Sequence, residues 1–225
     1  MGIPGENFIG IMSANEYLTR INLMGAGRPG EDTPVLKGNR VAVIGGGNTA
    51  MDSVRTALRQ GSKKAMIVYR RSLEEMPARV EEVHHAQEEG VEFMTLCNPI
   101  EYLADEKGRV RAMRVQRMEL GEPDASGRRS PVPIEGAIEE IEVDLVIVSV
   151  GVSPNPLIPN AIPELEISRR GTIVVNEETM QSSLYDIYAG GDIVRGGATV
   201  ILAMGDGRRA AAAMHRELTK QENGE

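Results

Sequence analysis

Residues 40–61 read RVAVIGGGNTAMDSVRTALRQG. The first five are an apolar run with strong β propensity, three glycines follow, and residues 48–60 carry apolar side chains at helical spacing until Gly61 ends the pattern. A strand, a glycine turn and an amphipathic helix in this order are typical of a dinucleotide-binding unit. Because residues 65–69 form a second apolar run, we predict a βαβ unit within a parallel sheet.

The glycines fit the dinucleotide pattern GxGxxG/A between Gly45 and Ala50. The first position permits a tight turn, Gly47 lets the backbone approach a pyrophosphate, and the small Ala50 lets helix and strand pack closely. The helix N-terminus adds unpaired N–H groups and positive potential. The alternative is a glycine turn that binds nothing. We predict a cofactor site at Gly45, Gly46, Gly47, Asn48 and Thr49.

The end of the second strand indicates which dinucleotide binds. A site for NAD places an acidic residue about 20 residues beyond the glycines, where it accepts a hydrogen bond from the ribose 2′-hydroxyl. Here the strand ends with Arg70, Arg71 and Ser72 instead. Guanidinium groups suit a 2′-phosphate because they form bidentate, charge-assisted hydrogen bonds. We therefore predict NADPH, the alternative being two surface arginines in solvent.

The following residues first continue the alternation of helix and strand and then depart from it. Residues 74–89 predict a helix, with Pro77 tolerated near its first turn. Period-two patterns at 110–116 and 138–143 predict an antiparallel meander around a loop rich in Gly, Pro and Ser at 121–136.

The nearly unbroken apolar run at 144–150 predicts a strand that is covered on both faces, and a second segment follows it. It is expected to hold strands at 172–175 and 187–189 and an alanine-rich helix at about 199–218. We therefore predict an α/β protein with a Rossmann-like domain, residues 6–152, that contains a parallel sheet and an antiparallel meander, followed by a second domain, residues 153–225.

In this second segment, residues 185–192 form a strand that runs into two glycines and Asp192. An aspartate at a strand end beside a helix start can hold a polyol hydroxyl. The backbone N–H groups of Ala198, Thr199 and Val200 can face an electron-rich ring oxygen. An ordinary Asx turn that caps the final helix explains the pattern equally well at this point.

Composition narrows the class of function. A net charge of -8 disfavours nucleic acid as the main partner. The single cysteine, Cys97, rules out a CxxC redox pair or a cysteine-rich iron–sulfur site within the chain. Neither a signal peptide nor a membrane span is evident, so we expect a cytoplasmic protein.

Six segments succeed one another along almost the whole chain: IPGE (3–6), VAVIGGGNTAMD (41–52), VYRRSLEEMPA (68–78), EEGVEF (88–93), DLVIVSVGVSPN (144–155) and AGGDIVRGGATVILAMGDGRRAA (189–211). Their order resembles the glutamate synthase small (beta) subunit family. The resemblance implies a flavoprotein with two dinucleotide-binding domains. In that family hydride passes from NADPH to FAD, and electrons move on through iron–sulfur clusters to a partner subunit. Related modules occur in dihydropyrimidine dehydrogenase and in ferredoxin:NADP oxidoreductase complexes.

The resemblance also assigns residues. Gly45, Gly47, Asn48 and Thr49 match the family's pyridine-nucleotide turn, and Arg70 and Arg71 match its 2′-phosphate pair. Gly151 lies in the crossover to the flavin domain. Gly191 and Asp192 match the contact with the ribityl chain and pyrophosphate of FAD, and Ala198, Thr199 and Val200 match the segment beside the isoalloxazine ring. No catalytic side chain is expected, because the cofactors carry the chemistry.

The chain departs from the family at its start, where the iron–sulfur region and the first FAD-binding motif are expected. We therefore expect a fragment whose C-terminal part is a remnant of the FAD domain, with FAD bound in the complete protein. Two hypotheses stay open. One is an NADPH-dependent enzyme module, and the other is a non-catalytic nucleotide-binding module that docks another chain. In either case, uncovered apolar surface favours self-association.

Overall fold

The computed structural model of the chain describes residues 1–124 and 127–222. It divides into two compact units, unit 1 from Met1 to Val150 and unit 2 from Gly151 to Glu225. The domain boundary expected from the sequence lies two residues further along the chain, between residues 152 and 153. None of the helices in the described ranges has the length and apolar character needed to cross a lipid bilayer.

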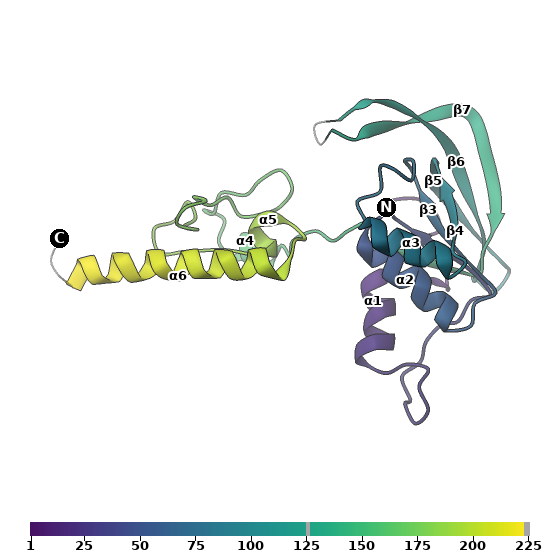
Figure 1. Cartoon of the computed structure of the whole chain (residues 1–225), viewed down its shortest axis with the longest axis horizontal. Coiled ribbons are helices and arrows are strands. Elements are labelled where there is room, and N and C mark those ends of the chain that lie inside the picture. The colour runs from purple at the N-terminus through teal and green to yellow at the C-terminus, as the bar shows by residue number, and fades with distance from the viewer. Residues whose placement is uncertain (125–126, 223–225) are drawn as a thin grey trace. The chain divides into compact units, whose positions relative to one another are not determined.

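Unit 1 is built around a five-stranded parallel sheet with the order β1-β8-β2-β3-β4. Figure 1 labels β3 and β4 of this sheet. The inner strands β2, β3 and β8 are buried along almost their whole length, as parallel strands covered on both faces require. This arrangement confirms the predicted α/β class. The strands are β1 (Ile11–Ser13), β2 (Arg40–Ile44), β3 (Lys64–Tyr69), β4 (Glu92–Thr95) and β8 (Leu145–Val148).

Helices cover one face of this sheet. The first, α1 (Ala14–Leu18), begins where the hydroxyl of Ser13 accepts the N–H of Glu16, and it continues as the π-helical turn η1 (Thr19–Leu23). The amphipathic helix α2 (Asn48–Arg59) buries Met51, Val54 and Ala57 against the strands. The last of these helices is α3 (Val80–Glu88).

A second sheet, antiparallel, covers the other face. It has the order β5-β6-β7, with β5 (Cys97–Ala104), β6 (Val110–Pro123) and β7 (Arg129–Glu142). The predicted meander is therefore confirmed, but the predicted loop at 121–136 is too long, because β6 and β7 stay paired as far as Pro123 and Arg129. Residues 125–126 of that loop lie outside the described residues. Prolines occur in β7 because it is an edge strand, where a missing N–H leaves no ladder bond unmade.

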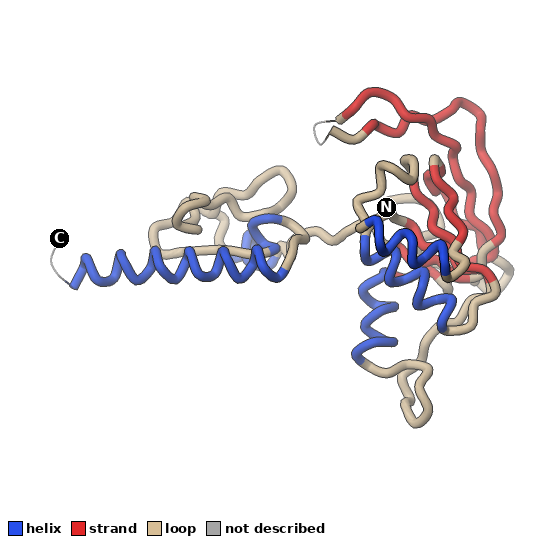
Figure 2. Tube along the Cα trace, in the orientation of Figure 1, coloured by secondary structure: helices blue, strands red, loops and turns tan. Residues whose placement is uncertain are grey.

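The alternation of side chains along the parallel strands produces two separate cores. Val41, Val43 and Ile147 pack with α1, α2 and α3 in one core. Ala42, Ile44, Met66 and Val146, on the opposite face, pack with residues of the antiparallel sheet such as Tyr102 and Met113. Unit 1 is thus a stack of helices, parallel sheet and antiparallel sheet, as Figure 2 shows.

The predicted helix at 74–89 is only partly right. The chain becomes helical at Val80, three residues after Pro77, and ends at Glu88. A proline disfavours helical dihedral angles at the residue before it. Segment 72–79 makes hydrogen bonds with the rest of unit 1 in place of helical ones. Local helical spacing is therefore overridden by contacts with the rest of unit 1.

Unit 2 has little regular structure apart from its last helix, α6 (Val200–Glu222), which Figure 2 shows as one long blue segment. Two short helices precede it, α4 (Leu157–Ala161) and α5 (Asp192–Arg195). The predicted strands at 172–175 and 187–189 are wrong. Within the described residues of unit 2 only isolated bridges form, Ile167–Ile173, Val175–Ser182 and Gln181–Tyr188. A small core contains Leu165, Ile173, Met180, Ala210 and Ala213.

Candidate functional site

The glycine turn between β2 and α2 leaves no room for side chains at its first two positions. A Cβ atom on Gly45 would lie 2.2 Å from the carbonyl oxygen of Ser149, and Gly45 has a φ of +141°, which favours glycine. A Cβ atom on Gly46 would lie 2.8 Å from the ring of Tyr69. The N–H of Gly45 donates to the carbonyl of Val68 at 3.0 Å. The turn is therefore tightly enclosed by β8 and β3.

Gly47 differs from its two neighbours, because nothing lies within 4 Å of the position that its Cβ would occupy. It is the N-cap of α2, with φ −90° and ψ 176°. The side chains of Asn48 and Thr49, in the first turn of the helix, are exposed. The first N–H groups of a helix have no partner within it. The turn thus presents open space, free backbone donors and the positive end of a helix dipole, which suit a diphosphate.

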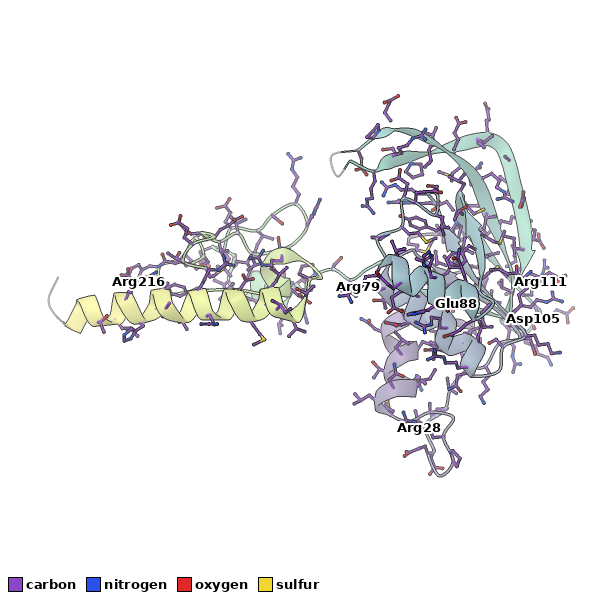
Figure 3. The ribbon with its side chains drawn as sticks, in the orientation of Figure 1. Arg28, Arg79, Glu88, Asp105, Arg111 and Arg216 are labelled. Atoms are coloured by element: carbon purple, nitrogen blue, oxygen red, sulfur yellow. The ribbon has the colours of Figure 1, made fainter. Side chains whose placement is uncertain are left out.

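Segment 72–79 holds the turn from the outside. The hydroxyl of Tyr69 donates to the carbonyl of Glu75 at 3.0 Å, and the N–H of Ala78 donates to the carbonyl of Gly46 at 3.1 Å. The N–H of Arg79, a residue labelled in Figure 3, donates to the Oδ1 atom of Asn48 at 2.8 Å. Sequence analysis missed this positioning role of Tyr69 and Asn48. Pro77 was the available signal, since it disfavours helix just before it.

The three residues that follow β3 have different surroundings. Arg70 is exposed, whereas Arg71 is only 5% exposed and forms an ion pair with Asp124, Nη2 to Oδ2, at 2.5 Å. Ser72 is half-buried. The first unit therefore gathers the predicted residues of the glycine turn and of the β3 end at the carboxyl edge of the parallel sheet, where ligands of such folds bind. It does not present both guanidinium groups to solvent.

The predicted residues of unit 2 lie around the start of α6. Gly191 is buried, has a φ of +77° and precedes α5, and the carboxylate of Asp192 accepts the N–H of Ala198 at 3.2 Å. The hydroxyl of Thr199 accepts the N–H of Leu202 at 3.4 Å, so that Thr199 caps α6, with Ala198, Thr199 and Val200 exposed. Gly151 is exposed at the first position of unit 2.

A buried carboxylate that sequence analysis missed organises this region. The side chain of Asp206 is 0% exposed and accepts hydrogen bonds from Arg195 (two at 2.7 Å), Arg209 (2.5 Å) and the N–H of Gly191 (2.9 Å). The hydrogen bonds from Arg195, and then that from Gly191, hold the pKa of Asp206 well below its usual value, against the opposing effect of burial. Asp206 thus ties the turn at 190–195 to α6.

Comparison with known proteins agrees with this arrangement. The family model described as pyridine nucleotide-disulphide oxidoreductase matches residues 1–207. A putative glutamate synthase [NADPH] small chain of Cereibacter sphaeroides is 43% identical over 95% of this chain, and the glutamate synthase [NADPH] small chain of Azospirillum brasilense is 41% identical over 94% of it. The resemblance to glutamate synthase small subunits is therefore confirmed. The chain spans only 52% and 45% of the lengths of these two relatives.

Among solved structures, FprA of Mycobacterium tuberculosis in complex with NADPH matches with a TM-score of 0.75 and 21% sequence identity. The match covers 100% of this chain and 62% of that one. At this identity the likeness concerns the fold, and it agrees with the predicted fold class.

The different surroundings of the glycines lead to a first prediction. Gly45→Ala should lower the free energy of unfolding by about 2 kcal/mol or more, because the added Cβ meets the Ser149 carbonyl at a backbone angle that alanine disfavours. Gly47→Ala, the matched control, should cost less than about 1 kcal/mol, since it only worsens an N-cap. Denaturant unfolding measures both. Equal losses would show that the turn is not enclosed as described.

The Asp206 cluster leads to a second prediction. Asp206→Asn should lower the thermal stability of unit 2, by an amount that is constant above about pH 4 and shrinks as the pH falls further. Folding lowers the pKa of this carboxyl, so the carboxyl stabilises the folded chain only while it is ionised. Protonation at low pH therefore removes the stability difference between the natural chain and the variant. Circular dichroism melts at several pH values measure the difference. The exposed Asp186→Asn is the control, and a similar effect there would contradict the assignment.

Proposed function

Because the chain belongs to the pyridine nucleotide-disulphide oxidoreductase family, we propose that unit 1 binds NADPH and that the chain serves hydride transfer between NADPH and FAD. The proposed activity is that of a glutamate synthase small-subunit-like oxidoreductase. The observation that carries the proposal is the enclosed glycine turn, whose open side lies over Gly47 at the start of α2. A cradle of this shape, closed behind and open in front, fits a diphosphate.

In this proposal each part of the dinucleotide has its own contacts. The diphosphate lies over Gly45, Gly46 and Gly47 and accepts hydrogen bonds from the backbone and from Asn48 and Thr49. The adenosine 2′-phosphate lies at the end of β3, near the residues Arg70, Arg71 and Ser72. NADPH supplies the hydride when it is bound. The residues of the chain bind and orient it, and no side chain has to act as an acid or base.

We assign the flavin contacts to unit 2. Gly191, with its positive φ, brings backbone close to the ligand, and the exposed carboxylate of Asp192 is able to accept a hydrogen bond from a hydroxyl of a polyol chain. The N-terminus of α6 directs backbone donors and positive potential toward an electron-rich ring. The residues so assigned are Gly151, Gly191, Asp192, Ala198, Thr199 and Val200.

The proposed partners follow from the exposed apolar side chains of unit 2. Val152, Leu157, Val200, Ile201 and Leu218 are each between 61% and 81% exposed. Exposed apolar side chains of this size favour a covering partner. We propose a flavin-binding region or a subunit with iron–sulfur clusters as that partner, with self-association of the chain as the other way to cover the surface.

The same exposed groups favour a second candidate function, a non-catalytic module that binds the nucleotide and docks another chain. The two functions differ in flavin chemistry. If hydride transfer is correct, the chain supplied with FAD should bind it and reduce an artificial dye at the expense of NADPH. Asp192→Asn should weaken FAD binding, whereas the exposed Asp186→Asn should not. A chain that stays colourless and reduces no dye at saturating FAD would favour the docking module.

The nucleotide assignment yields a sharper prediction. The natural chain should bind NADPH more tightly than NADH. Arg70→Ala should weaken NADPH binding by about tenfold or more, the loss expected for charge-assisted hydrogen bonds to a phosphate, and leave NADH binding unchanged. Arg28→Ala removes an exposed arginine elsewhere in unit 1 and should alter neither affinity (Figure 3). Titrations that follow nicotinamide fluorescence provide the affinities. Equal binding of both nucleotides by the natural chain would refute the choice of NADPH.

A further inference from the structure

The described residues at the open end of the β6–β7 ribbon, here called the ribbon tip, are Asp124, Arg128 and Arg129. Two of them contact residues that follow β3. The two strands pair as far as Pro123 and Arg129 (Figure 1). Just beyond Pro123, the carboxylate of Asp124 forms an ion pair with Arg71, and at the start of β7 the N–H of Arg129 donates to the Oε2 atom of Glu75 at 3.1 Å. Both contacts fall on residues 71–75, next to the proposed position of the 2′-phosphate. The antiparallel sheet therefore forms part of the surroundings of that position.

The ion pair between Arg71 and Asp124, here called the ribbon pin, is largely withdrawn from water. The side chain of Arg71 is 6% exposed and that of Asp124 is 31% exposed. By comparison, the pair between Arg111 and Glu140, in the same antiparallel sheet, has side chains that are 53% and 41% exposed. Removal of one partner from a buried pair is far more costly than removal of one from a surface pair, because it leaves an uncompensated charge.

The geometry of Arg71 restricts what it can do for a ligand. One terminal nitrogen, Nη2, donates to Asp124, and Nε is buried with no hydrogen-bond partner in the part of the chain that the structure describes. A phosphate that arrives from solvent has to compete with Asp124 for Nη2. Arg70, in contrast, is exposed, and no ion pair holds it within residues 1–124 and 127–222.

We propose that the two adjacent arginines have separate roles, Arg71 as a positioning residue that pins the ribbon tip through Asp124, and Arg70 as the residue that contacts the 2′-phosphate. The inference rests on the proposed binding of NADPH and refines its phosphate site. The pinned tip forms a fixed wall beside the site. Nucleotide preference then depends on Arg70, whereas Arg71 and Asp124 keep the wall in place.

Trypsin and nucleotide titrations, applied to the full chain, separate these roles. Trypsin cleaves after Arg128 and Arg129, which lie at the tip, so the rate of cleavage there reports whether the tip is held. Four variants are compared with the natural chain: Arg70→Ala, Asp124→Ala, the double variant Arg71→Met/Asp124→Leu, and the control Arg111→Ala (Figure 3). The double variant replaces the pin with an apolar contact of similar volume, a change that buried ion pairs often tolerate.

The proposal predicts a distinct result for each variant. Asp124→Ala should raise tip cleavage by about tenfold or more. The double variant should cleave at close to the natural rate and keep the preference for NADPH over NADH. Arg70→Ala should lose that preference with no change in cleavage, and Arg111→Ala should change neither quantity.

Two results would overturn the proposal. One is a rate of tip cleavage in Asp124→Ala equal to that of the natural chain, which would mean that the ion pair does not hold the tip. The other is loss of NADPH preference in the double variant as large as in Arg70→Ala, which would make Arg71 a phosphate ligand. Failure of the proposed function itself would give a different result, because the natural chain would then show no preference for NADPH over NADH. The cleavage rates would still test the ribbon pin.

Discussion

The arrangement of unit 1 depends on how closely the backbone at Gly45 and Gly46 approaches two neighbouring strands. The carbonyl of Ser149 and the ring of Tyr69 occupy the space that side chains would need, at 2.2 and 2.8 Å from the hypothetical Cβ positions. Only glycine permits this approach. It fixes where α2 begins, and so where the helix dipole points. It also places Tyr69 so that its hydroxyl secures segment 72–79 across the turn.

Unit 2 achieves order by different means. It has no extended ladder of strand hydrogen bonds among its described residues, and its buried apolar residues are few. In their place, the carboxylate of Asp206 gathers two guanidinium groups and one backbone N–H. A charge cluster of this kind is directional, so it specifies one geometry for the turn at 190–195, which a small apolar core alone does not.

Sequence reasoning succeeded where structure is local. The strand, turn and helix at 40–61 follow from spacing and glycine chemistry within a few residues, and β3 follows from the apolar run at 65–69, whereas β1 was not predicted. It failed where distant contacts decide. Residues 72–79 have helical spacing but bind Gly46 and Asn48 instead. Residues 121–123 and 129–136, rich in turn-forming residues, are held in strands by pairing and by the guanidinium of Arg129, which donates to the carbonyls of Leu120 and Gly121.

The candidate site shows the same limit in its electrostatics. A sequence reveals that Arg70 and Arg71 are adjacent, and adjacency suggests a double positive charge for one phosphate. It does not reveal which charge is already neutralised, because Asp124 lies 53 residues further along the chain and arrives only through the pairing of β6 with β7. Two guanidinium groups that are neighbours in sequence but differ in burial have different desolvation costs and different reach. The positive charge that such a motif offers to a ligand therefore has to be assessed for each arginine separately, once its ion-pair partners in the folded chain are known.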